Sequence, residues 1–298
     1  MSKSTIEWTD LTWNVTTGCD KVSAGCKNCY AETIAKRFWK DRKFSDVQFH
    51  EDRLLQPLKW KKPQKIFVNS MSDLFHEKVT DEQLDRIFAV MALRPQHTFQ
   101  VLTKRPQRML AYFSQESTAE RIRSKAFQLY MLGHKLGTPD AYTYWLYSED
   151  GNKYFTHYKC PIPLVNVWLG VTTENQKTAD ERIPLLLQTP AAVRFLSCEP
   201  LLEDIELQFA EFVDGVGETS QIHWVIVGGE SGHKARPCNL DWIRSIVVQC
   251  QLAEVPVFVK QLGRNPIEHF AKLALASKKG GDISEFPADL QIQEFPCS

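Results

Sequence analysis

The sequence has no excess charge of either sign, because its 298 residues carry 36 Lys and Arg against 36 Asp and Glu. Tight non-specific binding of nucleic acid depends on many phosphate contacts by Lys and Arg, so a neutral chain argues against it. The sequence also contains no apolar run long enough to span a bilayer, and no apolar signal region follows Met1. We therefore expect a cytoplasmic protein with no membrane partner.

The composition is otherwise that of an ordinary globular protein, with 43% hydrophobic and 24% charged residues. The length suits one large domain or two small ones. Eight cysteines are present. In a reducing cytosol, cysteines indicate metal or redox chemistry together with buried free thiols, rather than disulfides.

Three cysteines lie close together, since six residues separate Cys19 from Cys26 and two separate Cys26 from Cys29. Such spacing places several thiols on one side of a short loop, which suits a metal ion or an iron–sulfur cluster. A closed zinc site or a fully ligated cluster has four protein ligands, yet the nearest histidine along the chain is His50. Two interpretations follow: a cluster with one iron left open, or a zinc knuckle completed by a distant Cys or His.

Short apolar runs alternate with helical patterns along most of the chain, which is typical of βα units around a parallel sheet. Thr80 and Gln83 form a capping-box pattern at the start of one expected helix, 81–93, and another helix is expected over 30–40. We predict an α/β fold, a partial (βα)6-type TIM barrel over residues 1–263, with a C-terminal extension, 264–298, packing on it. The expected strands are 11–15, 65–69, 99–103, 165–170, 192–197, 224–228 and 255–260.

Polar side chains collect directly after these strands. In a βα barrel the carboxyl ends of the strands form the active face, so we expect these side chains to ring one mouth. The candidate binding residues placed in this way are Ser72, Asp73, Lys104, Thr172, Glu174, Glu199 and Glu230.

The stretch from Trp13 to Cys19, followed by Cys26-Lys-Asn-Cys29-Tyr-Ala31, resembles the cluster loop of radical S-adenosylmethionine enzymes. The spore photoproduct lyase-like branch has a similar loop, roughly Asn-Pro-Tyr-x-Gly-Cys-x3-Cys-x2-Cys-Tyr-Ala. Here six residues instead of three separate the first two cysteines, and Val15 replaces the usual proline. The wider spacing resembles a three-cysteine-motif family of phages and bacteria whose activity is unassigned.

The resemblance implies that Cys19, Cys26 and Cys29 hold a 4Fe-4S cluster whose open iron binds S-adenosylmethionine. One electron, supplied by a reductant such as flavodoxin or ferredoxin, then cleaves that cofactor to methionine and a 5′-deoxyadenosyl radical, which abstracts hydrogen from a substrate. The expected partners also include a protein encoded nearby. The alternative from another class is a zinc-stabilised, nucleic-acid-associated binding protein without catalytic activity.

The resemblance also implies roles for several strand-end residues. Ser72 and Asp73 occupy the position that contacts the amino group of S-adenosylmethionine, although the same pattern also suits a helix N-cap. Lys104, with its neighbour Arg105, faces either a carboxylate or phosphate or else the surface. Thr172, Thr173 and Glu174 match the positions that contact ribose and carboxylate.

Three further residues complete the expected site. Glu199 resembles a residue of the Pro-rich turn in these enzymes. Glu230 follows two glycines that permit close backbone approach to a ligand, so we expect it to line the pocket. Cys198 is a weak catalytic candidate as a hydrogen-atom donor, and a buried inert thiol is the favoured reading.

Residues 114–163 interrupt the βα rhythm with an expected helix, 120–132, and a hairpin of two aromatic strands. We expect this insertion to emerge on the active face as a lid, where its aromatic side chains either stack on a base or pack the hairpin. The basic stretch from Lys36 to Lys65 is either a solvated surface or a track for phosphates. Together they favour a nucleic acid or nucleotide as substrate.

Overall fold

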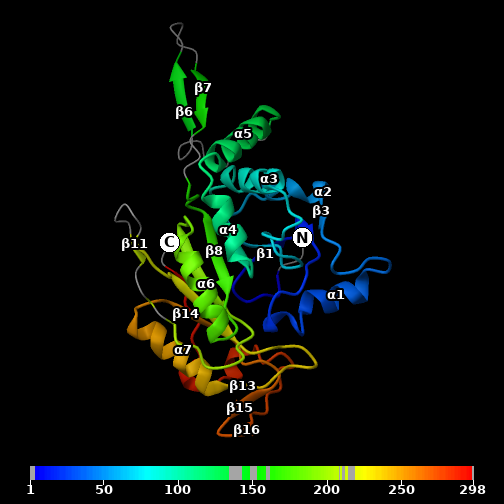
Figure 1. Ribbon diagram of the computed structural model, residues 1–298, viewed down its shortest axis with the longest axis vertical. Coiled ribbons are helices and arrows are strands. Elements are labelled where there is room, and N and C mark those ends of the chain that lie inside the picture. Colours follow the sequence, from blue (N-terminus) through cyan, green and yellow to red (C-terminus); the bar gives the residue numbers. More distant parts are fainter. Residues whose placement is uncertain are drawn as a thin grey trace.

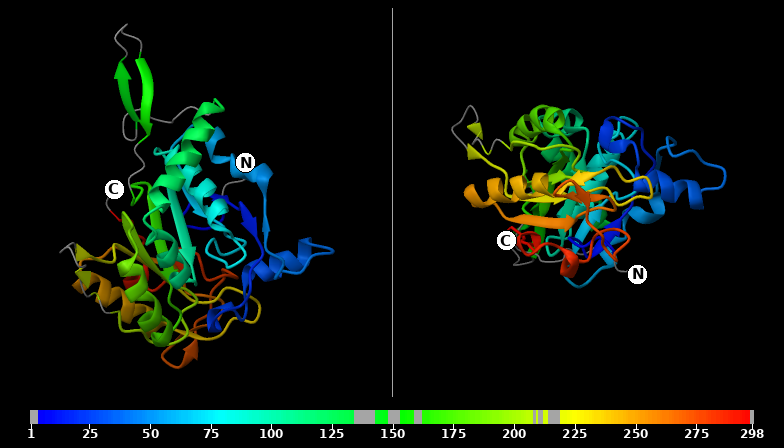
Figure 2. Two further views of the ribbon diagram at one scale, coloured as in Figure 1. Left: turned by 45° about the horizontal axis from the view of Figure 1, so that its top comes forward. Right: turned by 90° about the horizontal axis from the view of Figure 1, so that it is seen from below.

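The computed structural model describes residues 4–133, 143–147, 153–158, 162–207, 209, 212–213 and 219–296. Its centre is a seven-stranded sheet in which every neighbouring pair is parallel and the strand order follows the sequence. The sheet curls into a half-barrel (Figures 1 and 2). Its strands are β1 (Leu11–Trp13), β4 (Lys65–Val68), β5 (Thr98–Thr103), β8 (Val167–Thr172), β9 (Val193–Cys198), β12 (Trp224–Gly228) and β14 (Val257–Gln261).

Helices cover the convex face of the half-barrel (Figure 2). They are α3 (Asp81–Ala92), α4 (Pro106–Phe113), α6 (Gln176–Gln188) and α7 (Leu240–Leu252), and α1 (Tyr30–Phe38) follows the first strand. Alternate strand residues such as Ile66, Val68 and Phe99 point outward into the core shared with these helices. Because both faces of a parallel sheet are covered, its strands consist of nearly continuous apolar runs, as β8 and β12 do.

The other alternate residues fill the concave face with a separate aromatic cluster. Trp224 lies at its centre, 6.1 Å from Trp8 and 5.8 Å from Trp168 between ring centroids. Gly170 makes room for the Phe195 ring, because a Cβ at Gly170 would lie 2.5 Å from that ring. The cluster therefore closes the interior of the half-barrel away from the carboxyl ends of the strands.

The C-terminal segment covers the open edge of β14. Val259 donates to the carbonyl of Ile292 over 2.9 Å, and Glu294 donates to that of Val257 over 3.0 Å. Phe295 then stacks on Trp224 with ring centroids 5.3 Å apart. An uncovered edge strand would expose unpaired backbone groups, so this segment both packs on the half-barrel and protects it.

The remaining elements are short. β2 (Thr16–Thr17) pairs with β3 (Gln48–Phe49), and α2 (Glu51–Leu54) follows; β13 (Cys238–Asn239) pairs with β15 (Pro266–Glu268), and that strand with β16 (Ala271–Lys272); β10 (Phe212–Val213) pairs with β11 (Thr219–Ser220). Single 3-10 turns occupy 24–26, 57–59, 283–285 and 288–290. Among the described residues, no helix is both long and apolar enough to cross a membrane.

The sequence predicted all seven sheet strands and their parallel order, and the Thr80–Gln83 capping box is confirmed in both directions. The first strand is shorter than expected, because β1 ends at Trp13 and the chain then pairs as β2 with β3. The partial barrel is confirmed as a curled α/β half-barrel.

The insertion contains the expected helix and hairpin, as α5 (Thr118–Met131), β6 (Thr143–Tyr147) and β7 (Lys153–Tyr158), whereas the turn at 149–152 lies outside the described residues. Its role as a lid stays a prediction, although the structure does not bring it to the cysteine loop. The reason is α4, which carries the chain back along the sheet before the insertion begins, so α5 packs on α3 and the hairpin projects from the end opposite the cysteine loop (Figure 1).

Candidate functional site

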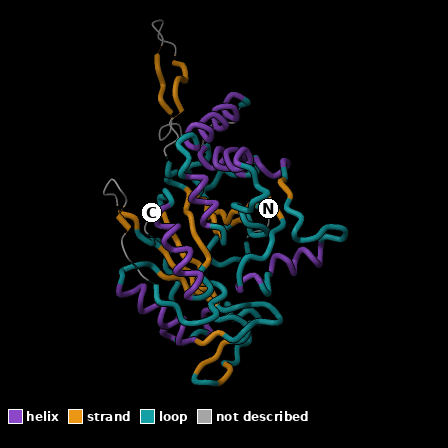
Figure 3. The backbone as a smooth tube through the Cα atoms, viewed as in Figure 1, coloured by secondary structure: helices purple, strands orange, loops and turns teal. Residues whose placement is uncertain are grey.

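The cysteine loop, residues 18–29, lies over the carboxyl ends of the sheet strands, an edge that Figure 3 shows as a cluster of loops. Gly18 is bridged to Ser72 and donates to the carbonyl of Met71 over 2.9 Å, which fixes the start of the loop beside the end of β4. Cys19, Cys26 and Cys29 are all free thiols of intermediate exposure. The loop therefore presents its thiols at the mouth of the half-barrel.

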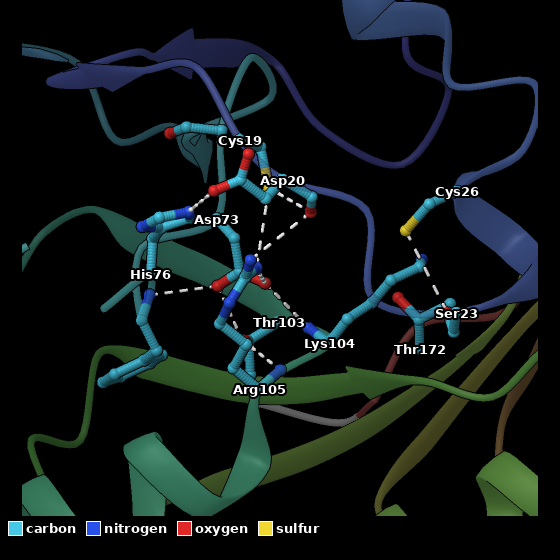
Figure 4. Close-up of polar contacts among 12 residues, drawn as sticks. Cys19, Asp20, Ser23, Cys26, Asp73, His76, Thr103, Lys104, Arg105 and Thr172 are labelled. Carbon is cyan, nitrogen blue, oxygen red and sulfur yellow. Dashed lines mark hydrogen bonds and ion pairs between the residues drawn. The ribbon is translucent and has the colours of Figure 1, made fainter. Parts of the chain in front are cut away.

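Asp73 holds the first cysteine through Arg105 (Figure 4). The buried carboxylate accepts from the Thr103 hydroxyl over 2.7 Å, from the backbone of Phe75 over 3.0 Å and from that of Lys104 over 2.9 Å. Arg105 Nη1 lies 3.2 Å from Asp73 Oδ2 and 3.5 Å from Cys19 Sγ.

The Cys19 thiol therefore sits in a mixed electrostatic environment. Burial and the charge of Asp73 raise the pKa of Cys19 to about 11, although the Arg105 guanidinium opposes them. Ligand thiols must lose their proton when they bind a metal. Arg105 is thus the group in this network that favours the thiolate form.

Glu174 holds the middle of the cysteine loop. Its Oε1 accepts from the backbone of Gly25 over 3.0 Å, while Oε2 accepts from Arg182 over 2.9 Å. Burial alone would raise the pKa of Glu174, but Lys104 and Arg182 bring it below the ordinary value. The fully buried Glu174 side chain is therefore ionised, and it accepts a hydrogen bond from the backbone amide of Gly25, which lies between Cys19 and Cys26.

Glu230 holds the end of the loop. It accepts from the Asn28 side chain over 2.9 Å and from the Arg236 guanidinium over 2.8 and 3.2 Å. Arg236 donates in turn to the carbonyl of Ala24 over 3.0 Å. Against the opposing effect of burial, Arg236 and Asn28 lower the pKa of Glu230.

Three carboxylates from three different strand ends thus converge on one loop. Glu174 and Glu230, expected as cofactor contacts, accept directly from the cysteine loop, whereas Asp73 reaches it only through Arg105. The Ser72 hydroxyl, also expected as a cofactor contact, lies 2.7 Å from that of Thr16 in β2. The structure brings these residues to the predicted mouth and gives them protein partners there.

The same mouth also contains Lys104, Thr172 and Glu199, whose polar side chains could contact a ligand. Within the described part of the chain, the Lys104 ammonium has no hydrogen bond or ion pair, and Figure 4 shows its side chain extending toward Cys26. Glu199 Oε2 accepts from Lys260 over 3.2 Å, whereas the buried Oε1, although 3.2 Å from the same ammonium, has no hydrogen bond. Burial raises the pKa of Glu199, and Lys260 opposes that rise.

Cys198 does not reach the mouth. It is fully buried in the core between the sheet and the helices, 3.2 Å from the Thr173 hydroxyl, and burial raises the pKa of its thiol to about 12. The cause is the two-residue alternation of β9, in which Phe195 faces the concave side and Cys198 the convex side. Cys238 and Cys250 are buried free thiols as well.

The site also contains residues for which sequence analysis predicted no defined role. Arg182, Arg236 and Asn28 complete the anchors of the loop, yet only Asn28 lies within a motif, between Cys26 and Cys29. Arg105 stood out only as a charged residue after a strand. Their partners lie up to 212 positions away in the sequence, so only the closed sheet brings them together.

The described residues contain no group of three or more His, Cys, Asp or Glu side chains that could hold a metal ion. Cysteine sulfurs bind zinc at about 2.3 Å and histidine nitrogens at about 2.0–2.1 Å, so the ligands of a single zinc ion lie close together. Cysteines that hold a four-iron cluster bind different irons and need not approach one another so closely.

The fold and this site define an α/β half-barrel protein with a three-cysteine loop at the carboxyl edge of its parallel sheet. Over residues 3–285 the chain matches the model of the family described as "Protein of unknown function (DUF5131)", and it belongs to that family. No curated protein and no solved structure matches the chain.

Proposed function

We propose that this protein is a radical S-adenosylmethionine enzyme that binds a 4Fe-4S cluster through Cys19, Cys26 and Cys29. The observation that carries the proposal is the loop itself: three free, half-exposed thiols are held over the mouth of a parallel half-barrel by carboxylates from three strand ends. So many contacts that fix the position of one loop are expected where the loop must hold a reactive group rigidly.

When bound, a cluster with one iron free of protein ligands would chelate S-adenosylmethionine and pass it the electron that cleaves it to methionine and a 5′-deoxyadenosyl radical. The electron would come from a one-electron donor such as flavodoxin or ferredoxin. The tasks of the protein are then to hold three thiolates, to orient the cofactor and to exclude water.

Lys104 and Glu199 are the residues best suited to contact S-adenosylmethionine. Lys104 offers an ammonium that makes no hydrogen bond or ion pair among the described residues, which matches a carboxylate. Glu199 offers a buried oxygen without a hydrogen bond, which matches an ammonium or a hydroxyl. Thr172 lies at the same mouth and supplies a hydroxyl. Asp73, Glu174 and Glu230 act on the loop in this scheme.

The test is anaerobic reconstitution with iron and sulfide. The protein should hold close to four irons and four sulfides per chain (the content of one such cluster) and, with dithionite and S-adenosylmethionine, should release 5′-deoxyadenosine slowly. Replacing any one of Cys19, Cys26 and Cys29 by Ala should abolish both results, and Cys250→Ala should change neither. Colourless protein with one tightly bound zinc would instead support the zinc-stabilised binding protein.

A further inference from the structure

A cavity of about 460 Å³ opens beside the cysteine loop, between that loop and the chain that follows α1. Its lining includes Cys19, Lys21, Lys36, Trp39, Lys43 and Phe44. The volume lies within the range of small-molecule sites. Of the residues that line this cavity, only Cys19 belongs to the network of anchors described above. The other lining side chains have no role in those anchors.

The cavity is positively charged. Four basic and two acidic side chains line it. Glu32 pairs with both Lys21, over 3.0 Å, and Lys36, over 2.8 Å, so one carboxylate is shared by two ammonium groups. Lys43 is exposed, and its ammonium makes no hydrogen bond or ion pair with the described part of the chain. An anion would therefore meet an available cation here.

The same cavity carries a fixed aromatic surface. The Trp39 and Phe44 rings lie 5.9 Å apart between centroids. The Arg42 guanidinium lies over the Trp39 ring at 4.1 Å and donates to the hydroxyl of Thr17 over 2.9 Å and to its carbonyl over 2.7 Å. Arg42 therefore ties the aromatic surface to β2 and is itself committed to the protein.

We infer that this cavity binds one nucleotide unit, with its base on Trp39 and Phe44 and its phosphate at Lys43. Flat aromatic rings accept any base by stacking, and lysines attract phosphate. The chain as a whole is neutral, so the affinity depends on this local surface and not on long-range charge. Nucleotide binding by the cavity does not depend on the proposed function. The further claim that the bound nucleotide is the substrate does rest on it, because the link is Cys19, which lines the cavity.

The experiment measures binding of a fluorescent, short single-stranded oligonucleotide to the full-length reconstituted protein at low salt, without reductant or S-adenosylmethionine. Lys43→Glu should weaken binding about tenfold and reduce the salt slope by about one. Lys62→Glu is the matched control, since Lys62 is exposed in the same basic stretch but does not line the cavity, and it should change binding less than about twofold.

The aromatic surface has its own matched pair. Trp39→Leu and Phe44→Leu should each weaken binding by about tenfold, because a stacked base is lost. Phe38→Leu, at an exposed neighbour outside the cavity, should have no effect. Phe44→Leu keeps the measurement meaningful if Trp39→Leu fails to fold.

Competition identifies the source of the nucleotide. Displacement by free mononucleotides supports a single-nucleotide ligand, and displacement by unlabelled single strand alone supports a strand. Equal binding of duplex and single strand, equal effects of Lys43→Glu and Lys62→Glu, or no binding at all would each overturn the inference. Iron content and 5′-deoxyadenosine release, measured on the same samples, show separately whether the proposed function holds.

Discussion

Arg105 donates from Nη1 to Cys19 Sγ over 3.5 Å, and the same nitrogen lies 3.2 Å from Asp73. This relationship makes Arg105 a bridge between the strand ends and the first thiol. It also gives Asp73 a task other than direct contact with a cofactor, since the carboxylate positions the guanidinium that faces the sulfur.

We predict that Arg105→Gln makes the Cys19 thiol harder to ionise. The pKa of Cys19 is already raised to about 11 by burial and by Asp73, and Arg105 is the cation that opposes them. In metal-free, reduced protein, alkylation of Cys19 near about pH 9 should slow by up to about tenfold, since one pKa unit changes the thiolate fraction by that factor. Mass spectrometry follows the rate, with Cys29 in the same sample as the reference. An unchanged ratio of the two rates would disprove the role of Arg105.

The same bridge separates two roles for Asp73. If Asp73 positions Arg105, Asp73→Ala should lower both the iron content and the binding of S-adenosylmethionine. If Asp73 contacts the cofactor directly, the same variant should keep its iron content unchanged while its binding of S-adenosylmethionine weakens. Iron analysis and equilibrium dialysis on one preparation distinguish these outcomes.

The loop anchors should lose stability in acid. The pKa values of Glu174 and Glu230 lie below their ordinary 4.5, so their ionised forms are favoured by folding. Their contribution is complete well above 4.5 and disappears as the pH falls through the lower folded values. Urea unfolding between neutral pH and about pH 4 should show a smaller acid-induced loss for the Glu174→Gln/Glu230→Gln double variant than for the natural protein.

At neutral pH, removal of the Glu174 carboxylate should strongly lower the free energy of unfolding. Glu174→Ala leaves the buried Arg182 cation without its carboxylate, a loss of about 3–5 kcal/mol in the free energy of unfolding. Glu181→Ala, which removes only an exposed pair with Lys177, is the control and should cost less than about 1 kcal/mol. Similar losses in both variants would mean that the anchor contributes little.

Gly170 should be intolerant of any side chain. Gly170→Ala places a methyl group against the Phe195 ring inside the aromatic cluster and should destabilise the protein by about 1–3 kcal/mol. Gly232→Ala meets no atom within 4 Å and should be nearly neutral. The double variant Gly170→Ala/Phe195→Leu should recover part of the loss, and the absence of any recovery would show that the strain lies elsewhere.

The sequence by itself determined the strands and the capping box, because these depend on neighbouring residues, and it indicated the parallel order through the alternation of strands with helices. It also placed the candidate residues at one mouth, since every strand of a parallel sheet ends at the same edge. What it could not supply was the partner of each side chain. Glu174 and Gly25 are 149 positions apart, and Glu230 and Asn28 are 202 apart.

Tertiary structure alone decided three further points. Successive side chains of β9 point to opposite faces of the sheet, and Cys198 lies on the face that packs against the helices. The α4 helix reverses the chain direction, so the insertion begins at the end of the sheet opposite the cysteine loop. The cavity at Trp39 and Lys43 arose where the chain after α1 returns beside Cys19. Local patterns fix which element forms, but the direction in which a side chain points and the residues that it meets depend on how the whole sheet curls and closes.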